Sequence, residues 1–129
     1  MALAGKVLNL KTLIVDDSVS FREILKEKLR SFSPSMVIHE AAEGSEVLQK
    51  VDALRPDLVF MDIRLPGENG IQLTQKIKAK SPNTKIIFLT SYDSLEYREA
   101  AIRSGGDCYF PKESLGYLEI ETLVKSLVG

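Results

Sequence analysis

The sequence predicts an α/β domain in which five parallel strands alternate with five helices, a (βα)5 doubly wound, three-layer sandwich. Short apolar runs recur along the chain, and such runs are typical of strands buried on both faces of a parallel sheet. Each run is followed by a stretch in which apolar residues recur every three or four positions, as on one face of a helix. Parallel strands joined by right-handed helical crossovers build this layered architecture.

Five segments are predicted as strands, and four of them run into polar residues. The predicted strands are Thr12–Val15, Met36–His39, Leu58–Met61, Lys85–Leu89 and Cys108–Phe110. The first, third, fourth and fifth are followed by Asp16 and Asp17, by Asp62, by Thr90 and Ser91, and by Pro111 and Lys112. Ligands of parallel sheets bind just outside the carboxyl ends of the strands. The sequence therefore predicts three carboxylates, a hydroxyl and an ammonium group around one spot.

The first helix is predicted after Asp17, where apolar residues follow at helical spacing. Its apolar face consists of Phe21, Ile24, Leu25, Leu29 and Phe32. Ser20 with Glu23 could form a capping box at its start, although Asp17 or Ser18 could cap it instead. Turn residues, Ser33 to Ser35 around Pro34, are expected to end it.

The second and third predicted helices are bounded by turn residues. The second opens at Gly44 and ends before Arg55, Pro56 and Asp57, and its apolar side carries Val47, Leu48, Val51 and Leu54. The third follows the loop Arg64–Gly70 and ends at Ser81, Pro82 and Asn83, with Leu73, Thr74 and Ile77 turned inward. Both patterns have the period of a helix with one buried face.

The fourth and fifth predicted helices complete the alternation. Asp93 with Glu96 makes a capping pattern for the fourth, and Gly105 with Gly106 is expected to end it. Its narrow apolar face is Tyr97, Ala100 and Ala101. Ser114 is expected to cap the fifth helix, whose apolar face is Tyr117, Ile120, Leu123, Val124, Leu127 and Val128. Leu118 falls on the opposite side and is expected to be an exposed apolar residue.

Size and composition favour one domain over residues 1–129 that needs no staple. The chain has 44% hydrophobic residues and a net charge of -1, which gives no basic surface for nucleic acid or an anionic membrane. The single Cys108 excludes an internal disulfide and suits a reducing cytosol, so a cytoplasmic location is expected. The longest apolar runs fall far below the roughly 18 residues of a membrane span, and Met1–Lys6 is too short for a secretory signal.

The predicted cluster suits a hard cation. Clustered carboxylates repel one another and so favour a cation, and Mg²⁺ (or Mn²⁺) prefers oxygen ligands. Asp16, Asp17 and Asp62 are therefore candidate metal ligands. Each polar residue also has a plain structural explanation: the first two could begin a helix, Asp62 could lie in a turn, Thr90 could start a helix, and Lys112 could be solvated. Their occurrence at four strand ends favours a site.

These residues resemble the receiver domain of two-component response regulators over nearly the whole chain. The resemblance rests on Asp16, Asp17, Asp62, Thr90 and Lys112 with their spacing, and on Pro66, Gly67 and Gly70 behind the third strand. It implies the strand order 2-1-3-4-5 of flavodoxin-like folds.

The resemblance also implies roles for the acidic residues. Asp62 is the expected phosphoacceptor and would form an aspartyl phosphate. Asp17 is expected to ligate the metal directly and Asp16 partly through water, and the backbone carbonyl of Arg64 would complete the protein ligands. A magnesium ion would remove the repulsion between the carboxylate and the incoming phosphoryl group.

The remaining residues are implied to sense the phosphoryl group. Thr90 would donate its hydroxyl to one phosphoryl oxygen and Lys112 would pair with another, which is mainly positioning and charge neutralisation. Thr90 would move inward, and Tyr109 would occupy the vacated space as the switch aromatic. The face of the fourth helix, fifth strand and fifth helix would then change, as a population shift between two packings. Leu118 is a candidate contact on that face.

Three residues depart from the family pattern. Glu113 follows Lys112 where the family often has a proline with a cis bond, so the geometry of that bond is open, since a non-proline cis bond costs roughly 3 kcal/mol. Arg64 and Tyr92 lie two residues beyond Asp62 and Thr90, where they would flank the path of the hydrolytic water. Bulky side chains there predict slow loss of the phosphate.

The function implied is a phosphorylation-dependent switch rather than an enzyme in its own right. A histidine kinase would be the phosphoryl donor, and another receiver or an output domain would be the partner of the changed face. The segment Asp62–Gly70 is similar to receivers that precede helix-turn-helix output domains, so the receiver of a transcriptional regulator is expected, with a stand-alone receiver as the alternative. His39 is expected to be structural and away from the site.

Other functions are weighed against this one. A Mg²⁺-dependent phosphohydrolase of the haloacid dehalogenase type would need an acid two residues after the nucleophile, where this chain has Arg64. A flavodoxin-like nucleotide binder would need a phosphate loop after the first strand, where Asp16 and Asp17 disfavour an anion. A degenerate receiver kept only for protein interaction would not need the complete acidic set.

Overall fold

The computed structural model describes residues 10–91, 93–114 and 116–128, apart from the side chains of Tyr117 and Val128. Its strands are β1 (Lys11–Val15), β2 (Val37–Ala41), β3 (Leu58–Met61), β4 (Lys85–Thr90) and β5 (Cys108–Pro111). Its helices are α2 (Val19–Phe32), α3 (Gly44–Leu54), α4 (Gly70–Lys80), α5 (Leu95–Arg103) and α6 (Tyr117–Val128), with a 3₁₀ turn at Lys112–Ser114. The alternation of strands and helices predicted from the sequence is confirmed.

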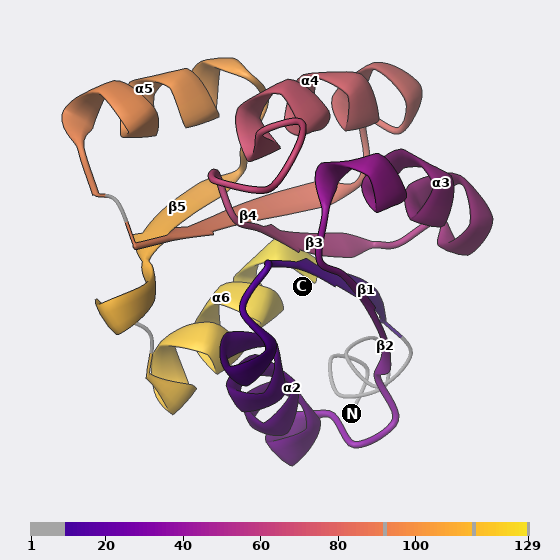
Figure 1. The fold of residues 1–129 in the computed structure, drawn as a ribbon. Helices are drawn as coiled ribbons and strands as arrows, with labels where there is room; N and C mark the ends of the chain where they lie inside the picture. The colour runs from indigo at the N-terminus through magenta and orange to yellow at the C-terminus, as the bar shows by residue number, and fades with distance from the viewer. Residues whose placement is uncertain (1–9, 92, 115, 129) are drawn as a thin grey trace.

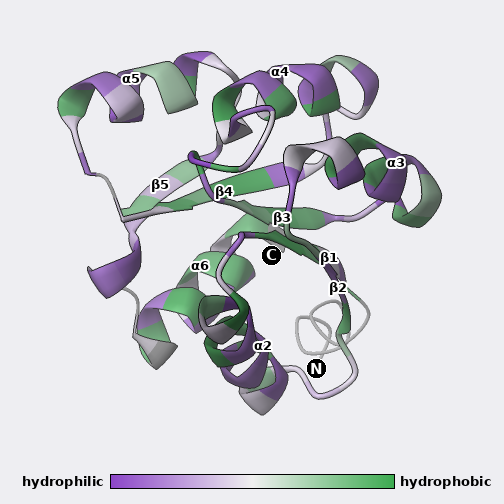
Figure 2. Cartoon of the chain, in the orientation of Figure 1, coloured by the Kyte–Doolittle hydropathy of each residue, from purple (hydrophilic) through white to green (hydrophobic). Residues whose placement is uncertain are grey.

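The five strands form one parallel sheet in the order β2-β1-β3-β4-β5. Helices α3, α4 and α5 cover one face and α2 and α6 cover the other (Figure 1). The three-layer sandwich and its strand order are therefore as predicted. Figure 2 shows why the layers hold together, since the central strands are hydrophobic along their length while the helices present mixed polar and apolar residues.

Alternating side chains of the strands enter two separate cores. Leu13, Val59 and Phe88 pack with α3, α4 and α5, whereas Ile14 and Phe60 pack with α2 and α6. The central strand β3 is buried at every position, as expected of a strand covered on both faces. Because β3 is apolar along its whole length, its polar neighbour Asp62 comes only after its carboxyl end.

Strand β2 differs from its predicted bounds. It pairs with β1 through Val37 to Ala41, whereas the sequence predicted Met36–His39. Glu40 and Ala41 continue the strand because β1 supplies their hydrogen-bonding partner, which a local pattern does not reveal. Met36 is buried just before the strand begins.

The structure shows which residues cap the helices, and two of the predicted caps were wrong. Helix α2 is capped by Ser18, whose Oγ accepts a hydrogen bond from the backbone N–H of Phe21 at 3.2 Å, so the alternative with Ser20 does not form. Helix α5 is capped by Ser94 rather than Asp93. The prediction that Ser114 caps the last helix was wrong, because Ser114 lies in the 3₁₀ turn and α6 begins later.

The predicted helix faces are confirmed in the main, apart from Tyr117 and Val128 of the last helix, whose side chains lie outside the described part of the structure. The inward residues of α4, namely Leu73, Thr74 and Ile77, are all buried, and Leu118 on α6 is 69% exposed as expected. Ile24 is the exception, since it lies at the margin of its face and is 51% exposed. None of the described helices is long and apolar enough to cross a membrane.

Candidate functional site

Three aspartates meet at the carboxyl edge of the sheet. Asp16 follows β1 and Asp62 follows β3, and the register pairs Val15 with Met61 directly before them. One carboxylate oxygen from each of Asp16, Asp17 and Asp62 lies within 4.8 Å of the others. Asp16 and Asp62 are buried whereas Asp17 is exposed. The sequence prediction that these three side chains share one spot is confirmed.

Backbone hydrogen bonds hold the two buried aspartates beyond the strand ends. The N–H of Asp16 donates to the carbonyl of Ala41 at 3.0 Å, and the N–H of Asp62 donates to the carbonyl of Val15 at 2.9 Å. Oδ1 of Asp16 accepts from the N–H of Ser18 at 2.9 Å. Because Ser18 also caps α2, one short loop positions the carboxylate and starts the helix.

Lys112 brings the ammonium group into the cluster. Its Nζ lies 2.6 Å from Oδ2 of Asp16 and 3.2 Å from Oδ2 of Asp62, and 4.5 Å from the centroid of the Phe21 ring. Burial lowers the pKa of Lys112, but the hydrogen bond with Asp16 and the charge of Asp62 outweigh it, so that the pKa is raised. Lys112 is therefore charged and serves two carboxylates at once.

Negative charge nevertheless exceeds positive charge in this cluster. Burial, together with the charge of Asp16, raises the pKa of Asp62 to about 6, against the opposing effects of Lys112 and of a hydrogen bond from the Arg64 backbone. A carboxyl group with a raised pKa is one whose charged form is insufficiently compensated. Three oxygen donors within reach of one cation, with surplus negative charge, fit a hard divalent ion such as Mg²⁺.

The loop after β3 packs closely against two glycines, one at the start of α3 and one at the start of α4, where a larger residue would not fit. A Cβ on Gly70 would lie 2.1 Å from the backbone oxygen of Asp62, and a Cβ on Gly44 of α3 would lie 2.6 Å from the backbone oxygen of Glu68. Gly67 has φ +85°, where a glycine avoids the strain that other residues would suffer. Of these, the close approach at Gly70 brings the start of α4 against the backbone of Asp62.

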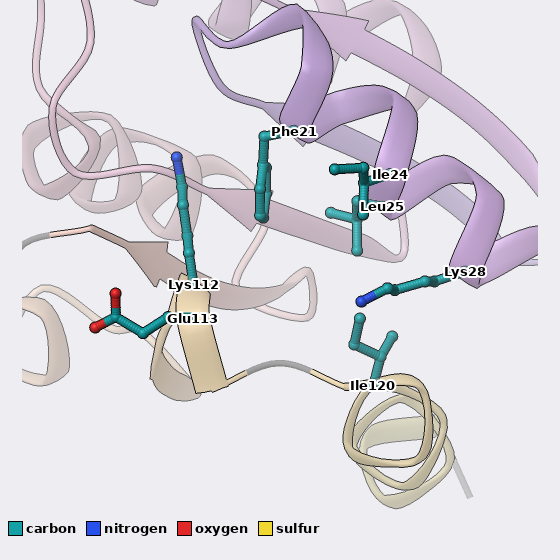
Figure 3. A pocket seen from close by; sticks show the side chains of 7 residues that line it. All are labelled: Phe21, Ile24, Leu25, Lys28, Lys112, Glu113 and Ile120. Carbon is teal, nitrogen blue, oxygen red and sulfur yellow. The ribbon is translucent and has the colours of Figure 1, made fainter.

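A pocket of about 300 Å³ opens over the cluster. It is lined by Asp17, Ser18, Asp62, Arg64, Ser91 and Lys112. A second pocket of about 330 Å³ lies on the other side of Lys112, between α2 and α6. Figure 3 shows Lys112 and Phe21 side by side at its margin, with Ile24, Leu25 and Ile120 on its apolar wall. Asp17 and Asp62 of the aspartate cluster line the first pocket, so it is the candidate site.

Thr90 and Tyr109 are not among the residues that line the acidic pocket. Thr90 is fully buried at the end of β4, directly before Ser91. The Tyr109 side chain is buried with the core against α3, α4 and α5, and the guanidinium of Arg98 lies 5.2 Å from its ring centroid. Burial raises the pKa of Tyr109. The two residues sit on neighbouring strands, since Phe88 of β4 pairs with Tyr109.

Several further expectations can be compared with the structure. Among the described residues no peptide bond is cis, so the bond between Lys112 and Glu113 is trans. Cys108 is partly buried on β5. His39 is exposed on β2, outside the acidic pocket. Arg64 lines the pocket, while the role of its carbonyl stays a prediction. The prediction for Tyr92 lies outside the described residues.

Sequence reasoning missed two residues around the cluster. Arg22 donates from Nη1 to the backbone carbonyl of Asp16 at 2.6 Å and from Nε to Oε1 of Glu40 at 2.8 Å. Arg22 stands on a helix and Glu40 on an edge strand, so their approach depends on the tertiary structure. The only local signal was a cation one turn into the helix that follows the two aspartates.

The comparisons with known proteins agree with this geometry. A family model described as the response regulator receiver domain matches residues 12–125. The chain is 36% identical over 117 residues to the transcriptional regulatory protein YhcZ of Bacillus subtilis (strain 168), covering 91% of this chain and 53% of that protein. It is 34% identical to the DNA-binding transcriptional activator DevR/DosR of Mycobacterium tuberculosis, covering 91% and 54%. The chain thus spans about half the length of the curated relatives it matches.

Solved structures show the same fold. A two-component response regulator from Clostridium difficile superposes with a TM-score of 0.85 at 27% identity, covering 92% of this chain and 95% of that one. A response regulator receiver domain protein (CheY-like) from Methanospirillum hungatei JF-1 superposes with a TM-score of 0.83 at 28% identity, covering 92% and 94%. Both similarities cover most of this chain.

Proposed function

The chain belongs to the response regulator receiver domains, and from that premise we propose that it is a phosphoacceptor switch that takes a phosphoryl group onto Asp62. The observation that carries the proposal is the cluster of Asp16, Asp17 and Asp62 at one edge of the sheet, with Lys112 between two of them. We also propose that residues 1–129 form a single receiver domain. Its role is regulatory, and its own chemistry is limited to gaining and losing the phosphoryl group.

The transfer makes one bond and breaks one bond. A carboxylate oxygen of Asp62 attacks the phosphorus of a phosphohistidine, an O–P bond forms, and the N–P bond breaks as the imidazole leaves. Asp16, Asp17, Asp62 and the Arg64 carbonyl would hold a Mg²⁺ (or Mn²⁺) ion, which supplies charge neutralisation and orientation of the phosphoryl oxygens. The raised pKa of Asp62 supports this assignment, because perturbed carboxyl groups in pockets are candidates for function.

Lys112 and Thr90 would respond to the new charge. Lys112 is already within 3.2 Å of Asp62, so its ammonium group can turn to a phosphoryl oxygen with little movement. The hydroxyl of Thr90 would move towards another phosphoryl oxygen. Tyr109, buried on the neighbouring strand, would report that movement to the surface formed by α5, β5 and α6. Such a switch is a shift between two packings driven by one local charge.

The surface of α5, β5 and α6 is the proposed partner face. Leu95 and Ile102 on α5 are 70% and 51% exposed, Leu118 on α6 is 69% exposed, and these apolar side chains are the proposed contacts. A second receiver or an output domain would bind there, and a histidine kinase would supply the phosphoryl group in the cytoplasm. No part of this proposal requires nucleic acid or a membrane to contact the domain itself.

The relatives favour a transcriptional output. YhcZ and DevR/DosR are transcriptional regulators, and this chain matches about half of each. We therefore propose that the domain regulates transcription through an output domain. A stand-alone receiver remains the alternative, and it would act through protein contacts alone.

Phosphorylation by acetyl phosphate with Mg²⁺, followed by intact-mass measurement, tests the proposal. The wild-type chain should gain one phosphoryl group, and Asp62→Asn should gain none. Asp57→Asn is the matched control, because Asp57 lies at the opposite end of the sheet, where it accepts from the Lys11 N–H at 2.9 Å. A phosphoryl gain that survives Asp62→Asn, or release of phosphate from small esters in multiple turnovers, would contradict the assignment.

A further inference from the structure

The backbone carbonyl of Asp16 receives a charged donor from outside the acidic pocket. Nη1 of Arg22 lies 2.6 Å from this carbonyl oxygen, and Nε of the same guanidinium lies 2.8 Å from Oε1 of Glu40. The Arg22 side chain is only 13% exposed. One planar guanidinium therefore joins the loop after β1 to the end of β2.

Strand β2 holds Asp16 by a second route. The Asp16 N–H donates to the carbonyl of Ala41 at 3.0 Å, and Ala41 is the residue directly after Glu40. The peptide groups on both sides of the Asp16 Cα are thus tied to the end of β2, one directly and one through Arg22. The Asp16 side chain then has a defined direction, towards Lys112 at 2.6 Å.

Glu40 is itself held by other groups. Its Oε2 pairs with Nζ of Lys26 at 2.9 Å, and Nζ of Lys50 donates to its backbone carbonyl. Burial raises the pKa of Glu40, but hydrogen bonds from Lys26 and Arg22 outweigh it and lower the pKa overall. Glu40 is therefore a charged anchor, and Arg22 is preorganised before any cation binds.

We propose that Arg22 and Glu40 are a positioning pair, which orients the Asp16 loop so that its carboxylate can serve a divalent cation and Lys112 together. This inference rests on the proposed function of the acidic pocket. The guanidinium also satisfies the Asp16 carbonyl with a charged donor. Groups that orient metal ligands in this way typically change metal affinity about ten-fold or more when they are replaced.

Lysine cannot replace arginine in this position. A guanidinium presents several donors in a fixed plane, whereas an ammonium group is a compact charge on a flexible stem. Arg22→Lys keeps the charge but loses the simultaneous contacts to Asp16 and Glu40. Glu40→Gln keeps one acceptor for Arg22 and should have a smaller effect. Lys26→Gln is the matched control. Lys26 lies on the same helix as Arg22 and pairs with Glu40, but it does not contact Asp16.

Mn²⁺ binding to the full chain, measured by electron paramagnetic resonance, tests the pair. Arg22→Lys should weaken Mn²⁺ binding about ten-fold, Glu40→Gln less, and Lys26→Gln hardly at all. With acetyl phosphate, Arg22→Lys should raise the Mg²⁺ concentration for half-maximal phosphorylation while the rate at saturating Mg²⁺ stays near that of wild type. A merely structural role would change the unfolding midpoint without this separation.

The outcomes separate the inference from the proposed function. If wild type binds Mn²⁺ and Arg22→Lys binds it equally well, the positioning pair is refuted and the phosphoacceptor proposal stands. Equal weakening by Arg22→Lys and Lys26→Gln would also refute it, because loosening Glu40 would then weaken binding as much as losing the contact to the Asp16 carbonyl. If wild type neither binds Mn²⁺ nor gains a phosphoryl group, the proposed function fails and the inference fails with it.

Discussion

Aspartates lie at both ends of the parallel sheet. Only those at the carboxyl end have more negative charge than the neighbouring cations and donors balance. At the amino end, Asp57 accepts from the Lys11 N–H at 2.9 Å, and Asp107 accepts from the Ile86 N–H at 2.8 Å and pairs with Lys78 at 3.0 Å. Each carboxylate there is at the surface and has donors of its own. These residues connect neighbouring strands and have a structural role.

At the carboxyl end the same residue type is placed under a different constraint. Asp16 and Asp62 are 1% and 6% exposed and share the single ammonium group of Lys112. The raised pKa of Asp62 is the consequence. The comparison indicates that the functional end of this sheet is recognised by surplus buried charge, since aspartates as such occur at both ends. Replacements at matched positions of the two ends should therefore have unequal effects.

Replacing the lysine at each end of the sheet should give the largest difference in stability between the two ends. Lys112→Met leaves two buried carboxylates without their shared partner, which should lower the free energy of unfolding by about 3 kcal/mol in metal-free buffer. Lys78→Met removes a surface pair and should cost less than about 1 kcal/mol. Urea denaturation of both variants provides the measurement. Equal losses would show that the two ends are electrostatically alike.

The pH dependence of stability should come next in size. Because the pKa of Asp62 is raised to about 6 from 3.8, the folded state binds this proton more tightly than the unfolded state, so this group destabilises the fold above pH 6. The penalty is relieved as the pH falls from about 7 towards 4. In metal-free buffer, Asp62→Asn should be more stable than wild type by about 1–2 kcal/mol at pH 7.5, and the difference should shrink at pH 5.

Asp57→Asn is the control for this titration. Its carboxylate accepts a backbone N–H at the amino end, so its replacement should not stabilise the fold at pH 7.5. A stability gain at Asp57 as large as that at Asp62, measured by urea denaturation at both pH values, would refute the contrast between the ends.

Magnesium should stabilise the fold through the carboxyl end alone. At several times its dissociation constant, Mg²⁺ should raise the free energy of unfolding by about 1 kcal/mol. Asp17→Asn should reduce this increment, because Asp17 contributes an exposed oxygen to the cluster, and Asp57→Asn should retain it. Thermal unfolding with and without Mg²⁺ measures the effect. An increment that Asp17→Asn leaves intact would place the cation elsewhere.

The smallest effect is expected from buried threonines. The Thr12 hydroxyl on β1 is buried without a hydrogen-bond partner among the described residues, so Thr12→Val should be neutral or stabilising by about 0.5 kcal/mol and should leave phosphorylation unchanged. Thr90→Val, at the carboxyl end, should fold but weaken the response to phosphorylation. Denaturation curves together with amide chemical shifts of β5 before and after acetyl phosphate treatment distinguish the two. A loss of response in Thr12→Val would contradict the assignment of function to one end.

Most of the fold could be predicted because its signals are local. The burial of β3 on both faces follows from the apolar run Leu58–Met61, and Ser33 and Ser81 end α2 and α4 where turn residues were predicted. The prediction was less accurate where the bounds of an element or the burial of a residue depend on a segment distant in the sequence. Strand β2 extends to Ala41 because β1 pairs with it, and Ile24 is exposed because α6 covers only part of the α2 face.

The sequence alone determined the alternation of strands and helices along the chain. It also determined which residues lie at the strand ends. Both depend on periodicities of two to four residues and on the rule that parallel strands end at one edge. The tertiary structure decided which of these residues form ion pairs. Lys112 lies 2.6 Å from Asp16 and Arg22 reaches Glu40 only after separate strands and helices have packed together, and electrostatic interactions depend on such distances and on burial.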